Sequence, residues 1–202
     1  MTEAGERWRT DDRPDPDRCA RLLADAFVRE PATSWICGGS ASVRQSWFTA
    51  TLRTQAALPG ARRHTLAGPD GRPVGAAVLT PPAAEPPAIA RARWAARVLA
   101  RCGPRPLGRT LSCLRAAEEG APEGAWTLEF VGVLPSAAGR GAGRRLLDHA
   151  LAGAPSTAGV FLTTADPGNV PIYRRLGFRT LRELPVGPLR VTAMYRMAAP
   201  GH

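Results

Sequence analysis

The sequence predicts a single α/β domain, and three observations support this class. Its length of 202 residues suits one domain with enough chain to bury a hydrophobic core. Stretches with apolar residues at helical spacing are interspersed with short apolar or alternating stretches that are typical of strands. No internal repeat and no segment with the composition of a linker divides the chain. We therefore expect one domain that spans residues 1–202.

The first part of the chain contains two predicted helices and a predicted hairpin. Apolar residues recur at helical spacing over residues 15–27, and again over residues 43–58, where a Pro-Gly pair ends the helix. Residues 62–82 contain two short strand-like stretches around the turn residues 69–71, Pro-Asp-Gly. This pattern predicts a β-hairpin, and the double proline ends its second strand.

Residues 81–124 have the least regular pattern. Prolines come first, and a helical stretch then places Arg93, Arg97 and Arg101 four residues apart. Such a stripe is compatible with an RNA or lipid surface. We expect a solvent-exposed helix face instead, because long arginine side chains commonly cover such faces.

The pattern becomes clearer after residue 124. Residues 126–133 are mostly apolar and predict a strand, and a helix is expected to begin at about Gly141. A second strand is predicted over residues 159–164, followed by a short helix around Tyr173. The alternating residues 189–197 predict a final strand. The order of these elements is typical of an α/β domain.

The formal net charge of +10 is carried wholly by arginine, because the chain contains no lysine. A basic domain attracts polyanions, so RNA, a membrane surface and a phosphate-rich cofactor are all compatible with this charge. No window approaches the roughly 18 consecutive apolar residues of a membrane span. The first ten residues carry charges where a signal peptide has its apolar segment. We therefore expect a cytoplasmic protein without a membrane partner.

The cysteines and histidines predict no metal site. The four cysteines lack the C-x-x-C spacing of zinc sites, and the three histidines lie far apart in the chain. We expect the cysteines to be core or surface thiols. They are Cys19, Cys37, Cys102 and Cys113.

The stretch AGRGAGRRLL, which follows the strand at residues 126–133, has the features of an anion-binding loop. Gly139, Gly141 and Gly143 permit backbone torsions that bring N–H groups toward one point, and the next helix adds its positive dipole end. A P-loop is excluded because the chain has no lysine. A dinucleotide fingerprint is excluded because no third glycine stands at the required place. Three arginines add positive charge: Arg140, Arg144 and Arg145.

The order of strand, glycine loop, helix, strand and NVPIYRRLGF resembles the GNAT superfamily of acyl-CoA-dependent N-acetyltransferases. The signature of that superfamily is Q/R-x-x-G-x-G/A, and Gly141 and Gly143 stand at its glycine positions. Tyr173 stands four residues before Gly-Phe, as in the superfamily, whereas Ala138 replaces the signature's Gln or Arg. The segments DAFVREPAT, GVLP, TTADPGNVPIYRRLGF and VGPLRVTAMYRM are similar, in order, to segments of puromycin N-acetyltransferases and related actinobacterial enzymes.

The resemblance implies a GNAT fold, which is an α/β structure with a mixed central sheet, a splayed strand pair and helices on both faces. It implies acetyl-CoA as co-substrate, with residues 1–124 as the acceptor-side half and residues 125–202 as the half that binds acetyl-CoA. The backbone groups of Val131 and Val133 are expected to pair with the pantetheine arm, and Asn169 to lie on the cofactor side. The loop residues expected to hold the cofactor are Ala138, Gly139, Arg140, Gly141, Ala142, Gly143 and Arg144.

The resemblance also implies direct transfer of the acetyl group to a primary amine. An ammonium must lose a proton before it can attack, so a base is needed. By position that base is Glu129 or Thr127, both of which share a face with Val131 if the strand keeps its period of two. Glu129 is the chemically suitable one, and a solvent-facing carboxylate at a strand end is the alternative. Tyr173 is expected to protonate the leaving thiolate with an ordinary pKa near ~10, the alternative being a tyrosine packed at the core edge.

The acceptor is expected to be a small-molecule amine, such as an antibiotic or a biosynthetic intermediate. Glu30 can hold a cationic amine and Trp35 can stack on an aromatic ring, although both are also ordinary surface or core residues. Two other functions stay open: acetylation of a peptide or protein N-terminus, and an RNA-binding or regulatory module that has kept the fold without turnover. We do not expect nucleic acid as a partner, and the sequence leaves a homodimer open.

Overall fold

The computed structural model describes residues 8–82, 84–155 and 157–198, and a mixed seven-stranded sheet lies at its centre. The strand order is β1-β2-β3-β4-β5-β7-β6. β4 and β5 run parallel, and all other neighbouring strands run antiparallel. The strands are β1 (Arg9–Asp11), β2 (Arg62–Ala67), β3 (Pro73–Thr80), β4 (Trp126–Val133), β5 (Val160–Thr164), β6 (Arg179–Val186) and β7 (Leu189–Arg196).

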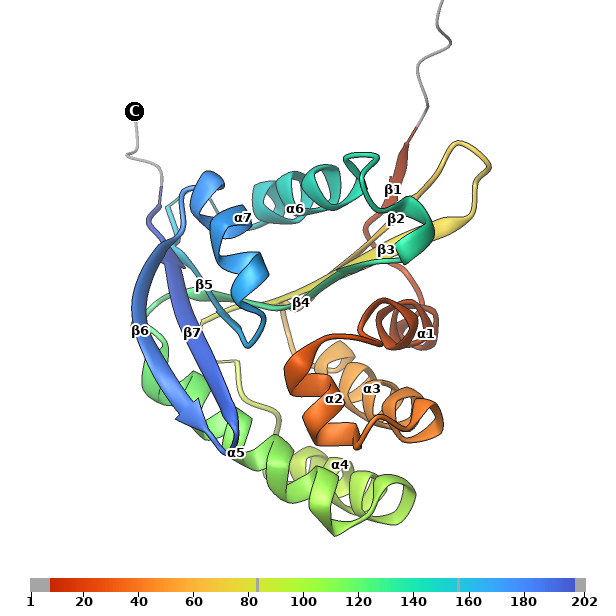
Figure 1. Cartoon of the computed structure of the whole chain (residues 1–202), viewed down its shortest axis with the longest axis vertical. Coiled ribbons are helices and arrows are strands. Elements are labelled where there is room, and N and C mark those ends of the chain that lie inside the picture. The colour runs from red at the N-terminus through yellow and green to blue at the C-terminus, as the bar shows by residue number, and fades with distance from the viewer. Residues whose placement is uncertain (1–7, 83, 156, 199–202) are drawn as a thin grey trace, which may run out of the picture.

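Helices cover both faces of the sheet, as Figure 1 shows. On one face lie α6 (Ala142–Gly153) and α7 (Val170–Arg175). The opposite side carries the helices of the first part of the chain: α1 (Pro16–Ala26), α2 (Pro31–Cys37), α3 (Ala41–Ala56), α4 (Ala88–Cys102) and α5 (Pro104–Gly120). The predicted α/β fold, with a mixed sheet between helices, is confirmed.

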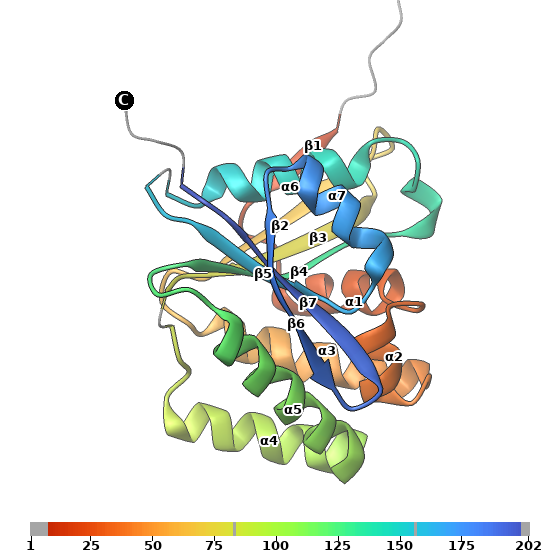
Figure 2. The same cartoon turned by 60° about the vertical axis from the view of Figure 1, so that its left-hand side comes forward.

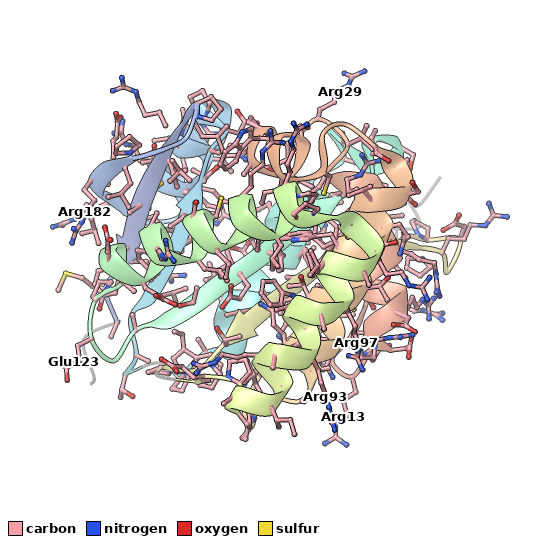
Figure 3. The ribbon with its side chains drawn as sticks, turned by 90° about the horizontal axis from the view of Figure 1, so that it is seen from below. Arg13, Arg29, Arg93, Arg97, Glu123 and Arg182 are labelled. Atoms are coloured by element: carbon pink, nitrogen blue, oxygen red, sulfur yellow. The ribbon has the colours of Figure 1, made fainter. Side chains whose placement is uncertain are left out.

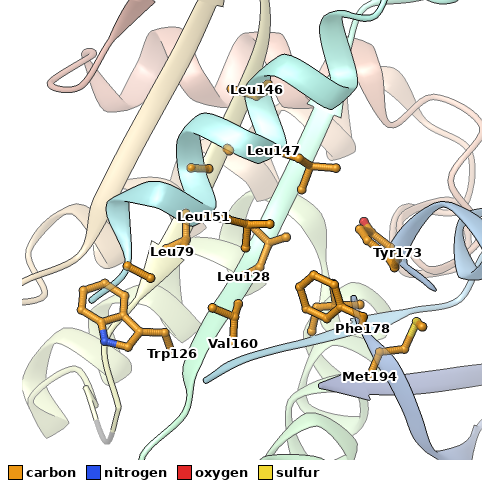
Figure 4. Close-up of a cluster of buried hydrophobic side chains, with 14 of the residues drawn as sticks. Leu79, Trp126, Leu128, Leu146, Leu147, Leu151, Val160, Tyr173, Phe178 and Met194 are labelled. Carbon is orange, nitrogen blue, oxygen red and sulfur yellow. The ribbon is translucent and has the colours of Figure 1, made fainter. Parts of the chain in front are cut away.

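The alternation of side chains along β3 divides the core between the two faces. Ala77 and Leu79 pack under α6, in a cluster that we call the α6-side core (Figure 4). Ala76 and Val78 pack against α1 and α3, in a cluster that we call the α1-side core. Because all four residues are fully buried, β3 is apolar on both faces, and this explains its near-continuous apolar sequence.

Most predicted elements are present with similar bounds. Asp15 caps α1, because its carboxylate accepts a hydrogen bond of 2.9 Å from the backbone N–H of Arg18. Ser40 caps α3 in the same way, through the N–H of Val43 at 3.4 Å. The predicted strand at residues 126–133 coincides with β4.

Four elements were not predicted: β1, α2, α5 and β6. Helix α5 begins with Pro104 in its first turn, where proline is tolerated because the N–H of that position is unpaired anyway. Strand β6 lies at the edge of the sheet with nearly all residues exposed, so it shows no alternation of apolar and polar residues.

The arginine stripe lies on the outer face of α4. Trp94 and Val98 are buried, whereas Arg93, Arg97 and Arg101 are exposed. Figure 3 shows Arg93 and Arg97 directed outward from this helix. The predicted solvent-exposed helix face is confirmed. Within the described residues, no helix is both long and apolar enough to cross a membrane.

Candidate active site

The sheet opens between its two parallel strands (Figure 2). β4 and β5 are in register at only two positions, Trp126 with Val160 and Thr127 with Phe161. Beyond Thr127, β4 continues to Val133 and pairs with β3 alone among the described strands. The expected splayed strand pair is therefore present.

The hydrogen bonds to β3 decide which groups of β4 face this opening. The N–H of Leu134 donates to the carbonyl oxygen of Val74 at 2.7 Å, so this pair exchanges hydrogen bonds across the antiparallel ladder. Alternate residues of an antiparallel strand point their backbone groups in opposite directions. Gly132 therefore faces β3, and the backbone groups of Val131 and Val133 face away from it. This arrangement makes both valines available to a ligand in the opening.

A β-bulge places Glu129 on a different face from the one that the period of two predicted. Val78 is opposite Phe130 and Leu79 is opposite Leu128, so Glu129 is the extra residue. Leu128 and Val131 both pack in the α6-side core although they are three positions apart. The expectation that Glu129 shares a face with Val131 is thus wrong.

The carboxylate of Glu129 lies against β3, where its Oε1 atom accepts a hydrogen bond of 2.7 Å from the hydroxyl of Thr80. Burial raises the pKa of Glu129 above its ordinary value, and the hydrogen bond from Thr80 opposes this shift. A carboxyl with a raised pKa is a stronger proton acceptor once it is ionised. Nothing in the sequence pointed to Thr80, because the bulge that brings the two side chains together has no sequence signature.

Tyr173 lies on α7 at the margin of the α6-side core. Its ring packs edge-on against Phe178, with the ring centroids 5.8 Å apart (Figure 4). Burial, together with the charges of Glu30 and Asp166, raises the pKa of Tyr173 to about 12. The pKa of this phenol is therefore not the ordinary one that was expected, although the phenol is protonated in the physiological range with either value.

The glycine loop leaves the N-terminus of α6 open. Gly139 and Gly141 both have φ of 74°, and Gly141 is the N-cap residue, with no side-chain cap to the helix amides. An added Cβ at either glycine would meet nothing within 4 Å, and one at Gly143 would meet only Val133, at 3.8 Å. Uncapped N–H groups at the positive end of a helix bind anions. The backbone at this junction therefore fits the pyrophosphate of acetyl-CoA.

Arg140 and Arg144 of the loop contact other residues of the protein. Arg140 places its guanidinium 5.7 Å from the ring of Trp8, the residue that precedes β1. Arg144 pairs with Asp148, one turn further along α6, at 2.7 Å. Ala138 and Arg145 are exposed beside them. Side chains thus anchor the loop, and its backbone N–H groups are the candidate anion-binding groups.

Asn169 ends the short 3₁₀ turn Pro167–Asn169 and directly precedes α7. It is half-buried, and its side chain makes no capping hydrogen bond to α7. The 3₁₀ turn is instead held by Asp166, whose carboxylate accepts a 2.8 Å hydrogen bond from the N–H of Gly168. The side-chain amide of Asn169 is therefore not committed to capping its own helix.

Glu30 and Trp35 lie at the two ends of α2. The carboxylate of Glu30 caps this helix through the N–H groups of Ala32, at 3.1 Å, and Thr33, at 2.6 Å. Its charge also contributes to the raised pKa of Tyr173, so the start of α2 lies near the phenol. Glu30 thus borders the candidate site, although its carboxylate already has partners.

Trp35 connects three elements. Its carbonyl oxygen accepts a hydrogen bond from Arg109 of α5, and its ring lies 5.2 Å from the same guanidinium. Gly187, in the turn between β6 and β7, approaches the ring so closely that an added Cβ would lie 2.5 Å from it. Trp35 therefore packs at a junction between α2, α5 and the hairpin, and no pattern in the sequence pointed to Arg109.

Two hollows, of about 250 and 300 Å³, lie near the end of β7. Arg196 and Met197 line both of them, and the larger also adjoins the C-terminal end of α6. Neither is lined by Tyr173, Glu129 or the glycine loop, so neither belongs to the candidate active site.

The candidate site thus combines an opened parallel strand pair and an uncapped helix N-terminus with the protonated phenol of Tyr173. The model of the acetyltransferase (GNAT) family matches residues 7–178, and the chain belongs to this family. It is an acyl-CoA-dependent N-acetyltransferase with acetyl-CoA as co-substrate.

Solved structures share the fold over nearly the whole chain. A protein from Corynebacterium glutamicum described as histone acetyltransferase HPA2 and related acetyltransferase is 23% identical, with a TM-score of 0.73 and coverage of 96% of this chain and 98% of that one. Arylalkylamine N-acetyltransferase 2 from Aedes aegypti is 12% identical, with a TM-score of 0.62 and coverage of 95% and 99%. An acetyltransferase from Thermus thermophilus is 19% identical, with a TM-score of 0.57 and coverage of 93% and 96%. At these identities the similarity concerns the fold.

Proposed function

We propose that this enzyme acetylates the primary amine of a small molecule by direct transfer from acetyl-CoA. The observation that carries the proposal is that β4 and β5 separate beyond Thr127, on the stretch of β4 that carries Glu129, a carboxylate of raised pKa, while Tyr173 provides a protonated phenol. Two titratable groups with such different proton affinities are suited to opposite roles. Glu129 accepts the proton of the attacking ammonium, directly or through water, and Tyr173 supplies a proton to the leaving sulfur.

The thiols of the chain support direct transfer. A covalent acetyl-enzyme would need a nucleophile such as a cysteine thiolate. Burial raises the pKa of all four cysteines, to about 11 for Cys19 and Cys113 and about 12 for Cys37, and above the ordinary value for Cys102. These thiols stay protonated at neutral pH, so the amine itself is the nucleophile.

The cofactor-side residues divide into backbone and side-chain groups. When bound, acetyl-CoA supplies an activated acetyl thioester. The N–H groups of Gly141, Ala142 and Gly143 hold its pyrophosphate, and the backbone groups of Val131 and Val133 pair with its pantetheine arm. Four other residues lie along the proposed acetyl-CoA site: Ala138, Gly139, Arg144 and Asn169. Arg140 adjoins them and contacts the ring of Trp8.

The acceptor enters from the side of α2. Glu30 contributes negative charge near Tyr173, which favours a cationic amine in this region. Trp35, which is held in place by its contact with Arg109, lines the neighbouring side of the proposed acceptor site. The resemblance of several short segments to puromycin N-acetyltransferases supports an antibiotic or a related biosynthetic amine as acceptor, and through it a role in antibiotic resistance.

A free-thiol release assay with acetyl-CoA tests this acceptor class. The panel contains puromycin, aminoglycosides, polyamines and short peptides with free N-termini. We expect thiol release with one or more small amines and not with the peptides. If only the peptides are acetylated, the proposal is wrong and the enzyme acts on the N-terminus of a peptide or protein.

Glu129→Gln is expected to lower kcat by about 10-fold or more, because general bases contribute at least this much.

The same substitution, Glu129→Gln, should stabilise the protein at neutral pH. The folded-state pKa of Glu129 is raised, so its favourable contribution is complete below the unfolded-state pKa and is lost as pH rises through the folded-state pKa. Denaturant titrations should therefore show a gain in the free energy of unfolding that grows with pH. Glu123→Gln, at an exposed position, is the control. A Glu129→Gln variant with the kcat of the parent and no gain in the free energy of unfolding would contradict the assignment of Glu129 as the base.

Changing Arg93, Arg97 and Arg101 together to glutamine separates the enzyme from an RNA-binding module. The three side chains are exposed on α4, and the helix is held by its buried face, so folding should be unaffected. We expect kcat/KM for a small amine within about twofold of the parent. Loss of turnover with acetyl-CoA binding retained would place this helix at the acceptor site.

A further inference from the structure

The fold assembles a cluster of two histidines and one aspartate that lies apart from the candidate active site. Asp12 follows β1, His64 lies on β2 and His149 lies on α6. The Oδ1 atom of Asp12 is 2.8 Å from Nδ1 of His64 and 2.6 Å from Nε2 of His149. The two imidazole rings are 5.0 Å apart and nearly perpendicular. The expectation that the histidines lie too far apart for a metal site is wrong for this pair.

The sheet and α6 bring these residues together. β1 pairs with β2 so that Asp11 is opposite Thr65, and this register carries Asp12 to the level of His64. His64 has the same parity on β2 as Leu66, which packs in the α6-side core, so both side chains point toward α6. His149 meets them from the helix above.

We propose that Asp12, His64 and His149 form a binding site for a divalent transition-metal ion, with Zn²⁺ as the best fit. Their potential ligand atoms all lie within 4.8 Å of one another. Two imidazoles and one carboxylate are a donor set that zinc accepts, with a fourth position left for water. The side chain of Asp12 is 62% exposed and that of His149 33%, so an ion has access from solvent and a water can complete its coordination.

The spacing of the three groups requires a small outward movement. Metal–ligand distances of about 2.0–2.1 Å in a tetrahedral site separate the ligand atoms by about 3.3 Å. The contacts to Asp12 are about half an ångström shorter than this. Because the Asp12 side chain is mostly exposed, rotation about its own bonds can supply the movement without disturbing the core.

The buried nitrogen of His64 provides a second, independent observation. Its Nε2 atom has no hydrogen-bond partner among the described residues, although the side chain is only 6% exposed. This atom faces the last turn of α6, since a Cβ at Gly153 would lie 3.2 Å from it. When Nδ1 donates to Asp12, Nε2 presents a lone pair to the negative end of the helix, which is unfavourable.

A metal ion on Nδ1 removes this mismatch. The ring proton then resides on Nε2, where an N–H, unlike a lone pair, is favoured by the negative end of the helix. Metal-bound histidines characteristically direct their second nitrogen toward a carbonyl or carboxylate.

The ion would connect the edge of the sheet to α6. β1 is a three-residue strand that pairs only with β2 among the described strands. A shared ion adds a link from the residue after β1 to the middle of the helix that carries the glycine loop. The site is therefore structural, and its effect is expected on stability.

Calorimetric titration of the untagged protein with Zn²⁺ tests the proposal, with thermal unfolding as a second measurement. We expect one ion per chain and a rise in Tm with added Zn²⁺. His149→Gln and Asp12→Asn should each weaken Zn²⁺ binding at least about 10²-fold, because even indirect partners of a metal contribute 10- to 100-fold. Both positions are solvent-accessible, so these variants are expected to fold.

Two matched controls should retain binding: Asp148→Asn, next to His149 but paired with Arg144, and His202→Ala, which removes the remaining histidine. The absence of saturable binding by the parent would overturn the proposal. Parental affinity in His149→Gln and Asp12→Asn, or loss of binding in His202→Ala alone, would also overturn it.

Discussion

Replacing Tyr173 with phenylalanine is expected to lower kcat by about 10²-fold or more while acetyl-CoA binding stays nearly unchanged. The substitution keeps the ring that packs against Phe178 and removes only the hydroxyl. Because the pKa of Tyr173 is raised to about 12, the lost group is a proton donor throughout the working pH range. A positioned acid usually contributes a factor of 10² to 10⁴, and the loss should fall on kcat, since the ground state is bound as before.

Tyr195→Phe is the matched control, because the chain has only two tyrosines and Tyr195 lies on β7 beside Gly159, at the paired end of β4 and β5. We expect kcat within about twofold of the parent for this variant. Steady-state kinetics and calorimetry with acetyl-CoA on both variants decide the matter. A Tyr173→Phe enzyme that keeps kcat within about twofold while chemistry is rate-limiting would show that another group protonates the sulfur.

The double substitution Gly141→Val and Gly143→Val is expected to abolish measurable acetyl-CoA binding. Gly141 has a φ of 74°, which a β-branched residue resists, so valine there distorts the loop. Gly143 has ordinary helical torsions and open space around its missing Cβ, so valine there projects into the space over the helix N-terminus. Loss of two charge-assisted hydrogen bonds of about 1.5–3 kcal/mol each corresponds to at least 10²-fold in affinity.

Gly143→Val alone distinguishes a side chain that blocks the acetyl-CoA site from a distortion of the loop backbone, because it leaves the torsions of Gly141 unchanged. It should still weaken acetyl-CoA binding strongly. Gly108→Val is the control, because Gly108 is a helical glycine on α5 with equally open surroundings. Calorimetry that finds unchanged affinity in a folded double variant would remove the loop from the cofactor site.

Sequence reasoning was most successful where a local pattern determines the structure. The bounds of β4 follow from a short stretch that is mostly apolar, and the start of α6 follows from Gly141, whose positive φ ends the loop. Tyr173 was placed on its short helix because its spacing to Gly-Phe is local. In each case the deciding interactions lie within a few residues along the chain.

The features that were missed depend on contacts between distant segments. The bulge at Glu129 arises from the register between β3 and β4, and only that register brings Thr80 to the carboxylate. His64 and His149 meet because a strand and a helix from different parts of the chain pack together. The pKa of Tyr173 depends on burial and on the charge of Glu30, which belongs to the opposite half of the sequence. No spacing rule within one segment contains this information.

On the proposed binding mode, the opening between β4 and β5 also gives the co-substrate a structural role in the sheet. Among the described residues, β4 and β5 are paired at only two positions, and these join the part of the sheet formed by β1 to β4 to the part formed by β5, β7 and β6. On the proposed binding mode, the pantetheine arm satisfies the free backbone groups of Val131 and Val133, as a neighbouring strand would. A ligand that binds only the folded chain adds RT ln(1 + [L]/Kd) to its stability. The resistance of this enzyme to unfolding and proteolysis should therefore follow the acetyl-CoA concentration around it, and so the supply of activated acetyl groups.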